Sequence, residues 1–224
     1  MQIRPFLTEK SAERLLRHLR AREDWRLLVN QGEKLFELDR PAQQALTAAA
    51  RQKLEAAIHK AAREQFQFCF ETIRVPDDPG EREGDPTPLA EFARFMSSPE
   101  VLEPLRRITG CGSIGFADAQ ATAYGPGHFL TGHDDNVTGK NRHAAYVLSL
   151  ASRWRPEWGG LLMFHRDDGN IEEALTPCFN SLNLFKVPQL HSVSYVAPFV
   201  PYRRYAVTGW LRSSSESATI AEGR

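Results

Sequence analysis

The stretch that most restricts the fold of this chain runs from residue 113 to residue 211, where short apolar runs follow one another with no helical stretch between them. Turn residues separate these runs, as at residues 167–170, and residues 153–160 form a tryptophan-containing turn that ends in two glycines. Several short strands at close spacing indicate an antiparallel barrel or sandwich. The segments expected to be strands are 113–124, 144–150, 161–165, 178–186, 192–196 and 205–211.

Residues 1–112 have a different pattern, in which apolar residues recur at helical spacing and strong helix formers are frequent. Thr8 is a suitable N-cap for the first helix, and Ser98 for the last. We expect these helices to pack on the outside of the sheet. Helices are predicted at 9 to about 23, 43–65, 89–96 and 99–108, and strands at 25–29, 35–38 and 66–75, the last of them half-buried.

The segment 76–88 contains five acidic residues, four prolines and two glycines, so it is not expected to continue any regular element. Its composition predicts a mobile loop. Such a loop beside a barrel can close over a substrate, and a solvated connector without a function is the alternative.

A His-x-Asp pair, His133 and Asp135, lies at the end of the run Phe129-Leu130-Thr131-Gly132. In an extended segment the two side chains would share one face of a strand, because side chains alternate with period two. His191, from a distant segment, can supply a third ligand. Two imidazoles and one carboxylate that leave other positions open are typical of a non-haem iron(II) site, whereas a structural zinc site would require four ligands, usually with cysteine.

A second polar set lies on the segment 203–211. Alternation places Arg204, Thr208 and Trp210 on one face, while Arg203 points the other way. An arginine and a threonine on an otherwise apolar strand face would be costly to bury without an anion to bind. We therefore expect a pocket for a carboxylate of an organic co-substrate near Arg204.

Composition limits the classes of protein that need consideration. Lys and Arg together number 28, and Asp and Glu also 28, so no strong field favours nucleic acid or a membrane surface. The three cysteines are widely spaced, which argues against a disulfide framework. The sequence has neither a membrane-length apolar run nor the apolar core of a signal peptide. We expect one soluble, cytoplasmic domain over residues 1–212, with 1–112 as helical support, 113–212 as the β core and 213–224 as a disordered tail.

In several ordered blocks, residues 113–212 resemble the double-stranded β-helix, a jelly-roll or cupin-like barrel, of the 2-oxoglutarate- and Fe(II)-dependent dioxygenases. The blocks are most similar to those of the prolyl hydroxylase branch that acts on a ribosomal protein, and the closing block also resembles the oxygen-sensing prolyl hydroxylases. The resemblance implies an α+β fold with the N-terminal helices outside the barrel. The blocks are Phe129–Asp135, Ala144–Leu150, Trp158–Leu162 and Arg204–Trp210.

The resemblance also implies roles for individual residues. His133, Asp135 and His191 match the iron ligands. Arg204, Tyr124 and Thr208 match residues of the 2-oxoglutarate pocket, and Arg142 and Trp210 match positions that face the substrate proline. Ser149 stands where the oxygen sensors have a second tyrosine on the co-substrate.

On this interpretation the chain is a dioxygenase that hydroxylates an unactivated C–H bond with release of succinate and CO2, using Fe(II), 2-oxoglutarate and O2, with ascorbate as a candidate reductant. The favoured substrate is a prolyl residue of a protein or peptide. The same chemistry on a free amino acid or other small metabolite is an alternative, and a metal-binding sensor without turnover is a second one. Neither nucleic acid nor a membrane is an expected partner, and the sequence does not define an oligomeric state.

Overall fold

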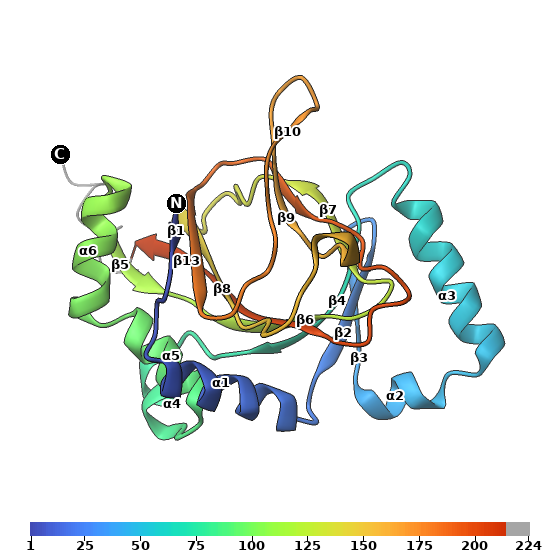
Figure 1. The fold of residues 1–224 in the computed structure, drawn as a ribbon, viewed down its shortest axis with the longest axis horizontal. Coiled ribbons are helices and arrows are strands. Elements are labelled where there is room, and N and C mark those ends of the chain that lie inside the picture. The colour runs from blue at the N-terminus through green and yellow to red at the C-terminus, as the bar shows by residue number, and fades with distance from the viewer. Residues whose placement is uncertain (214–224) are drawn as a thin grey trace.

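The computed structural model describes residues 1–213 and shows an antiparallel sheet that curls into a half-barrel, flanked by helices (Figure 1). In the described chain the sheet has 13 strands in the order β1-β11-β8-β13-β6-β4-β7-β12-β9-β10. Strand β2 pairs with β3 and β4, and β5 pairs with β13. Because neighbours in space are mostly distant in sequence, residues from the whole second half of the chain meet inside the barrel.

The strands of the second half are short, as their turn-rich sequence predicts. The strands are β1 (Gln2–Ile3), β2 (Arg26–Gln31), β3 (Lys34–Leu38), β4 (Phe68–Arg74), β5 (Ile114–Ala117), β6 (Gln120–Tyr124), β7 (Phe129–His133), β8 (Arg142–Ser149), β9 (Leu162–His165), β10 (Ile171–Leu175), β11 (Ser181–Lys186), β12 (His191–Val193) and β13 (Arg204–Ser213). A single 3-10 turn, Pro156–Trp158, precedes β9.

The helices begin where capping residues predict. The side chains of Thr8, Thr47 and Thr87 each accept a hydrogen bond from a first-turn backbone N–H, whereas Ser98 occupies an N-cap position without such a bond. Gly110 ends the last helix in the left-handed conformation that glycine favours. The helices are α1 (Glu9–Ala21), α2 (Arg40–Ala45), α3 (Ala48–Ala61), α4 (Pro79–Gly84), α5 (Pro88–Met96) and α6 (Pro99–Thr109).

The largest core lies between the sheet and the helices α1, α5 and α6. Leu15 and Leu19 of α1 and Met96 of α5 are buried there against the outward side chains of β8 and β13, among them Leu148 and Val207. The intervening residues of the same strands, such as Val147, face the barrel interior and form a separate apolar cluster. One face of these strands therefore packs against the helices, and the other face lines the interior of the barrel, where side chains can form a site.

Three expectations for the helices and strands were wrong. The helix predicted at 43–65 is two helices, because the chain is extended at Leu46 and Thr47 and restarts with Thr47 as a cap. The strand β4 is buried over most of its length rather than half-buried, because α3 and other strands cover it. The short strands β1 and β10 lay outside the predicted set.

The segment 76–88, predicted to be a loop without regular structure, contains the short helix α4. Arg82 holds this helix in place because its buried side chain donates hydrogen bonds to the backbone oxygens of Pro76 and Ala117 and lies over the ring of Phe116. The proline-rich composition of the segment did not predict that one buried arginine would hold it in place. The predicted tail, apart from Ser213 at the end of β13, lies outside the described residues. In the described part of the chain, no helix is long and apolar enough to cross a membrane.

Candidate metal and co-substrate site

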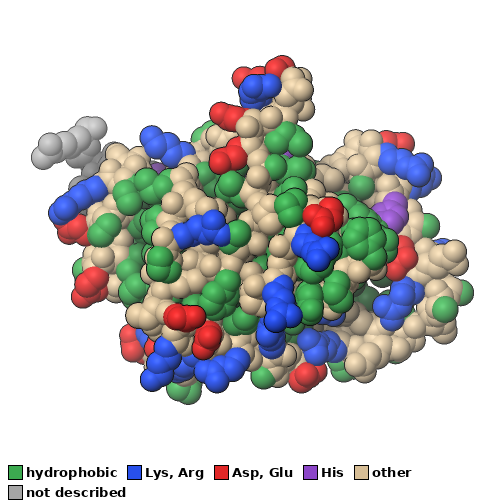
Figure 2. All heavy atoms as spheres, viewed as in Figure 1, with side chains coloured by type: hydrophobic (Ala, Val, Ile, Leu, Met, Phe, Trp, Pro, Cys, Tyr) green, Lys and Arg blue, Asp and Glu red, His purple; other side chains and the backbone are tan. Residues whose placement is uncertain are grey.

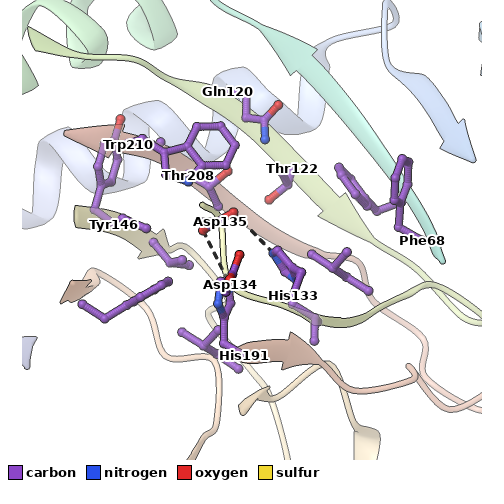
Figure 3. A pocket seen from close by; sticks show the side chains of 18 of the residues that line it. Phe68, Gln120, Thr122, His133, Asp134, Asp135, Tyr146, His191, Thr208 and Trp210 are labelled. Atoms are coloured by element: carbon purple, nitrogen blue, oxygen red, sulfur yellow. Dashed lines mark ion pairs between the residues drawn. The ribbon is translucent and has the colours of Figure 1, made fainter. Parts of the chain in front are cut away.

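Three side chains predicted to bind metal converge inside the barrel. His133 ends β7 and His191 begins β12, and these two residues are direct partners in the antiparallel register of the two strands. One donor atom from each of His133, Asp135 and His191 lies within 4.8 Å of the others. Nε2 of each histidine is 3.5 Å from a carboxylate oxygen of Asp135 (Figure 3). This spacing allows the three side chains to bind one ion.

Asp135 lies beside the two histidines, as predicted, but the predicted reason, alternation along one strand, was wrong. Strand β7 ends at His133, so the two residues do not share a strand face by alternation. Instead, Asp135 has a φ of 63°, a left-handed conformation that aspartate tolerates better than most residues. This turn brings the carboxylate back toward the imidazoles.

Hydrogen bonds to the backbone orient both imidazoles. Nδ1 of His133 is 3.1 Å from the carbonyl oxygen of Thr131, and Nδ1 of His191 is 2.7 Å from that of Gln189. A carbonyl oxygen can only accept, so each Nδ1 carries the proton and each Nε2 is left with its lone pair toward Asp135. Metal-bound histidines commonly have such a bond on the other ring nitrogen.

The environment keeps this cluster in the protonation state that a cation requires. Burial, together with the neighbouring His133, lowers the pKa of His191 to about 4, so its imidazole is neutral near pH 7. Burial alone would raise the pKa of Asp135, but the neighbouring imidazoles of His133 and His191 hold it below its usual range. The neutral imidazole of His191 and the anionic carboxylate of Asp135 suit a divalent first-row metal, and His133 is a partly exposed residue of the cavity lining.

Arg204 lies in the wall of the same cavity, which has a volume of about 360 Å³. Its side chain is 3% exposed, yet it forms no hydrogen bond or ion pair with any residue in 1–213. Burial lowers its pKa from the usual value. The ring of Tyr124 lies 5.1 Å from the guanidinium carbon and stacks on Phe70. A buried cation that only an aromatic face contacts is costly unless an anion completes the site.

Arg203 has a different environment from Arg204, as strand alternation predicts. It lies exposed just before the start of β13 and forms an ion pair with the buried carboxylate of Glu71 on β4. Thr208 lines the same cavity as Arg204. The structure therefore places Arg204, Tyr124 and Thr208 together around the cavity and excludes Arg203.

Arg142 and Trp210 also lie together at this cavity. The guanidinium carbon of Arg142 is 3.5 Å from the centre of the Trp210 ring, and Nη1 donates a hydrogen bond to the backbone oxygen of Asp135. Asp118 fixes the other partner, because its carboxylate accepts a 2.6 Å hydrogen bond from the backbone N–H of Trp210. These two side chains form a rigid edge beside the ligand cluster.

Sequence reasoning missed a second wall of the cavity. Gln120 and Thr122 point into it from β6 (Figure 3), and the hydroxyl of Thr122 is buried without a hydrogen-bond partner in the described chain. Counting back from Tyr124 in steps of two along β6 would have found both residues. In the same way, the rings of Phe68 and Phe70 face the cavity from β4.

The remaining histidines near the motif do not join the cluster. His165 is 2.7 Å from the hydroxyl of Ser192, and His143 is 2.7 Å from that of Ser213. Nδ1 of His128 accepts a hydrogen bond from the backbone N–H of Gly125. Ser149, which replaces a tyrosine of the oxygen sensors, is buried with an unpartnered hydroxyl in the described chain.

Comparison with known proteins agrees with this geometry. Residues 119–212 match the 2OG-Fe(II) oxygenase superfamily, and this segment contains the three residues of the cluster together with Tyr124, Arg204 and Thr208. This segment is therefore similar to a superfamily of oxygenases that, by its name, uses iron(II) and 2-oxoglutarate. No curated protein matches the sequence.

Solved structures show that the fold is that of the prolyl hydroxylases. A Pseudomonas putida prolyl-4-hydroxylase superimposes with a TM-score of 0.60 and 18% identity, covering 96% of this chain and 92% of its own. A Trichoplax adhaerens prolyl hydroxylase, solved with a peptide of the hypoxia inducible factor oxygen degradation domain, has a TM-score of 0.57 and 18% identity, covering 98% and 86%. The double-stranded β-helix predicted from the sequence is confirmed.

Proposed function

We propose that the protein is a 2-oxoglutarate- and iron(II)-dependent hydroxylase of prolyl residues in a protein or peptide. The observation that carries the proposal is the presence, in one cavity, of three converging metal donors and a buried guanidinium that has no partner in residues 1–213. A metal ion alone would not explain why an unpaired guanidinium is buried beside it. A dicarboxylate that binds the metal with one carboxylate and Arg204 with the other accounts for both features.

In this proposal His133, Asp135 and His191 hold the iron, and Arg204 fixes the distal carboxylate of 2-oxoglutarate by a charge-assisted pair. The iron supplies the chemistry that couples oxidation of 2-oxoglutarate to C–H hydroxylation: one oxygen atom of O2 enters succinate, CO2 leaves, and the second oxygen atom enters the product. Tyr124 bounds the carboxylate pocket.

Residues around the site hold the metal-binding side chains in position and line the co-substrate pocket. The carbonyls of Thr131 and Gln189 hold the imidazoles with Nε2 facing the metal position, so little reorganisation is required on binding. The aromatic side chains of Phe68 and Phe70 give the pocket an apolar lining. Thr122 and Thr208 offer hydroxyl groups to the co-substrate from the adjacent strands β6 and β13.

Two features support a prolyl substrate. Arg142 and Trp210 form a flat, rigid edge at the cavity, which suits the apolar ring of proline beside a backbone carbonyl that can accept from the guanidinium. Two solved structures that share the fold are, by their titles, prolyl hydroxylases, one of them with a peptide bound. The substrate proposal extends this property to the present chain.

The experiment incubates the protein with Fe(II), 2-oxoglutarate and O2, and with either a library of proline-containing peptides or the free amino acids. The proposal expects stoichiometric succinate and a gain of one oxygen atom on a peptidyl proline. The same gain only on a free amino acid would refute the peptide substrate and keep the chemistry. Iron binding with no succinate under any condition would refute the enzymatic function.

A further inference from the structure

A second groove lies next to the cavity. It has a volume of about 330 Å³ and shares five lining residues with the cavity, so the two are adjacent. Three of the shared residues, Trp210, Gln120 and Phe68, lie on the side of the cavity across from His191 (Figure 3). A substrate longer than one amino acid would leave the cavity along this groove.

The two sides of the groove differ in chemistry. One side is apolar and consists of Leu28, Leu35, Phe68 and Phe70, and Leu35 is 48% exposed there. The other side is formed by the end of β4, the chain before β6 and the residues around 140 and 212, and it is lined by charged groups. A groove with one apolar and one charged side suits an extended polypeptide, whose side chains alternate between the two sides.

Positive charges exceed negative charges in this groove. Its cations are Arg74, Lys140, Arg142 and Arg212, and its carboxylates are Asp77 and Asp118. Both carboxylates pair with Arg212, at 2.9 Å and 3.3 Å. No acidic group of the groove is left for the other cations.

Arg142 is occupied by the face of Trp210 and the backbone oxygen of Asp135. Arg74 and Lys140 are exposed, and within residues 1–213 their side chains form no hydrogen bond or ion pair. The two unpaired cations therefore give the groove a net positive potential, which favours an anionic partner.

We propose that this groove binds the polypeptide that flanks the hydroxylated residue, and that Arg74 and Lys140 select substrates with an acidic side chain close to that residue. The inference rests on the proposed function, because it takes the cavity as the place of the target residue. It adds a specificity determinant outside the cavity, and it favours a protein substrate over a free amino acid. An apolar side chain of the same segment would lie on Leu35 and Phe68.

The test is a binding measurement that does not depend on turnover. Iron-loaded protein with 2-oxoglutarate, kept without O2, is titrated with short peptides that have one central proline and carry Asp, Asn or Lys at each flanking position in turn. The charge-reversed double variant Arg74→Glu/Lys140→Glu is compared with the wild type. Lys10→Glu/Arg17→Glu, which changes the same charge at exposed positions of α1 outside the groove, is the matched control.

We expect the wild type to bind the best Asp peptide about 3- to 10-fold more tightly than its Asn counterpart at low salt, and less so at high salt, because the pairs are exposed. The double variant should lose this preference and favour the Lys peptide, whereas the α1 control should keep the wild-type order. Thermal unfolding of each variant checks that it is folded.

Three results would overturn the inference. Equal binding of the Asp, Asn and Lys peptides by the wild type would show that the groove does not select charge. An Asp preference that survives in the double variant would place the selection elsewhere. Binding of a single-stranded oligonucleotide in place of every peptide would identify a different polyanion as the occupant. Admission of O2 then tests the proposed function separately: hydroxylation without an acidic preference refutes only the groove, and absence of any product refutes the hydroxylase itself.

Discussion

Replacement of Arg204 by methionine should have opposite effects on co-substrate binding and on the stability of the ligand-free protein. The guanidinium is 3% exposed, lies in the cavity wall and has no hydrogen-bond or ion-pair partner among residues 1–213. Removal of one partner of a buried, hydrogen-bonded ion pair typically costs about 3–5 kcal/mol. The affinity for 2-oxoglutarate should therefore fall by about 150- to 5000-fold.

The ligand-free protein should become more stable in the same variant. An uncompensated buried charge destabilises the fold, and a methionine of similar length removes it, so we expect a gain of about 1–3 kcal/mol in the free energy of unfolding. For a chain of this size the gain corresponds to a rise of about 2–10 °C in the melting temperature. Calorimetric titration with 2-oxoglutarate and thermal unfolding without it measure the two effects.

Arg203→Met is the control, because Arg203 is adjacent in sequence and faces the other way. It pairs with Glu71, which is 1% exposed, so its loss leaves a buried carboxylate without its cation. We expect this variant to keep the affinity for 2-oxoglutarate within a few-fold and to lose about 1–3 kcal/mol of stability. An unchanged affinity in Arg204→Met, or a marked loss of its ligand-free stability, would refute the reasoning, as would a loss of binding in Arg203→Met.

Three further predictions concern single residues. In Gly209→Ala the new Cβ would lie 2.0 Å from the carbonyl oxygen of Asp118, so we expect the free energy of unfolding to fall by more than about 3 kcal/mol. Denaturant unfolding measures this loss, and an unfolding midpoint equal to that of the wild type would contradict the predicted steric clash. Thr122→Val removes a buried cavity hydroxyl that has no partner in the described chain, so the free energy of unfolding should stay the same or rise by up to about 1 kcal/mol. The variant should bind 2-oxoglutarate up to about tenfold less tightly. An affinity equal to that of the wild type would show that Thr122 does not contact the co-substrate. Burial lowers the pKa of His128 to about 4, so its stabilising contribution is complete above pH 6.5 and is lost as the pH falls toward 4, by up to about 3 kcal/mol. Because asparagine does not titrate, His128→Asn should lose less stability than the wild type as the pH falls from 6.5 to about 4, measured by unfolding at a series of pH values. The same dependence of stability on pH in both proteins would show that His128 does not contribute.

The sequence was sufficient to predict those parts of the site that depend on alternation along a regular strand. On β13 it separated Arg204 and Thr208 from Arg203, because the strand is long and continuous. It also predicted the set of metal donors, because the residue types themselves carry that chemistry. The same counting along β6 would have predicted Thr122, had Tyr124 been taken as its reference.

The parts that could not be predicted depend on irregular backbone or on contacts between distant segments. The turn that carries Asp135 has a left-handed φ, which a His-x-Asp spacing does not reveal. The helix α4 is held by the buried side chain of Arg82, whose partners at Pro76 and Ala117 are known only once the chain has folded. The groove beside the cavity combines four separate segments, and the balanced overall charge of the chain hides its local excess of cations.

The most direct test of the account is a crystal structure of the protein grown without O2 in the presence of Fe(II) and 2-oxoglutarate, with the metal located by its anomalous scattering. The account predicts one ion bonded to Nε2 of His133, a carboxylate oxygen of Asp135 and Nε2 of His191, with 2-oxoglutarate between the ion and the guanidinium of Arg204. An ion outside this cluster, a fourth protein ligand that closes the site, or a co-substrate that does not contact Arg204 would contradict it.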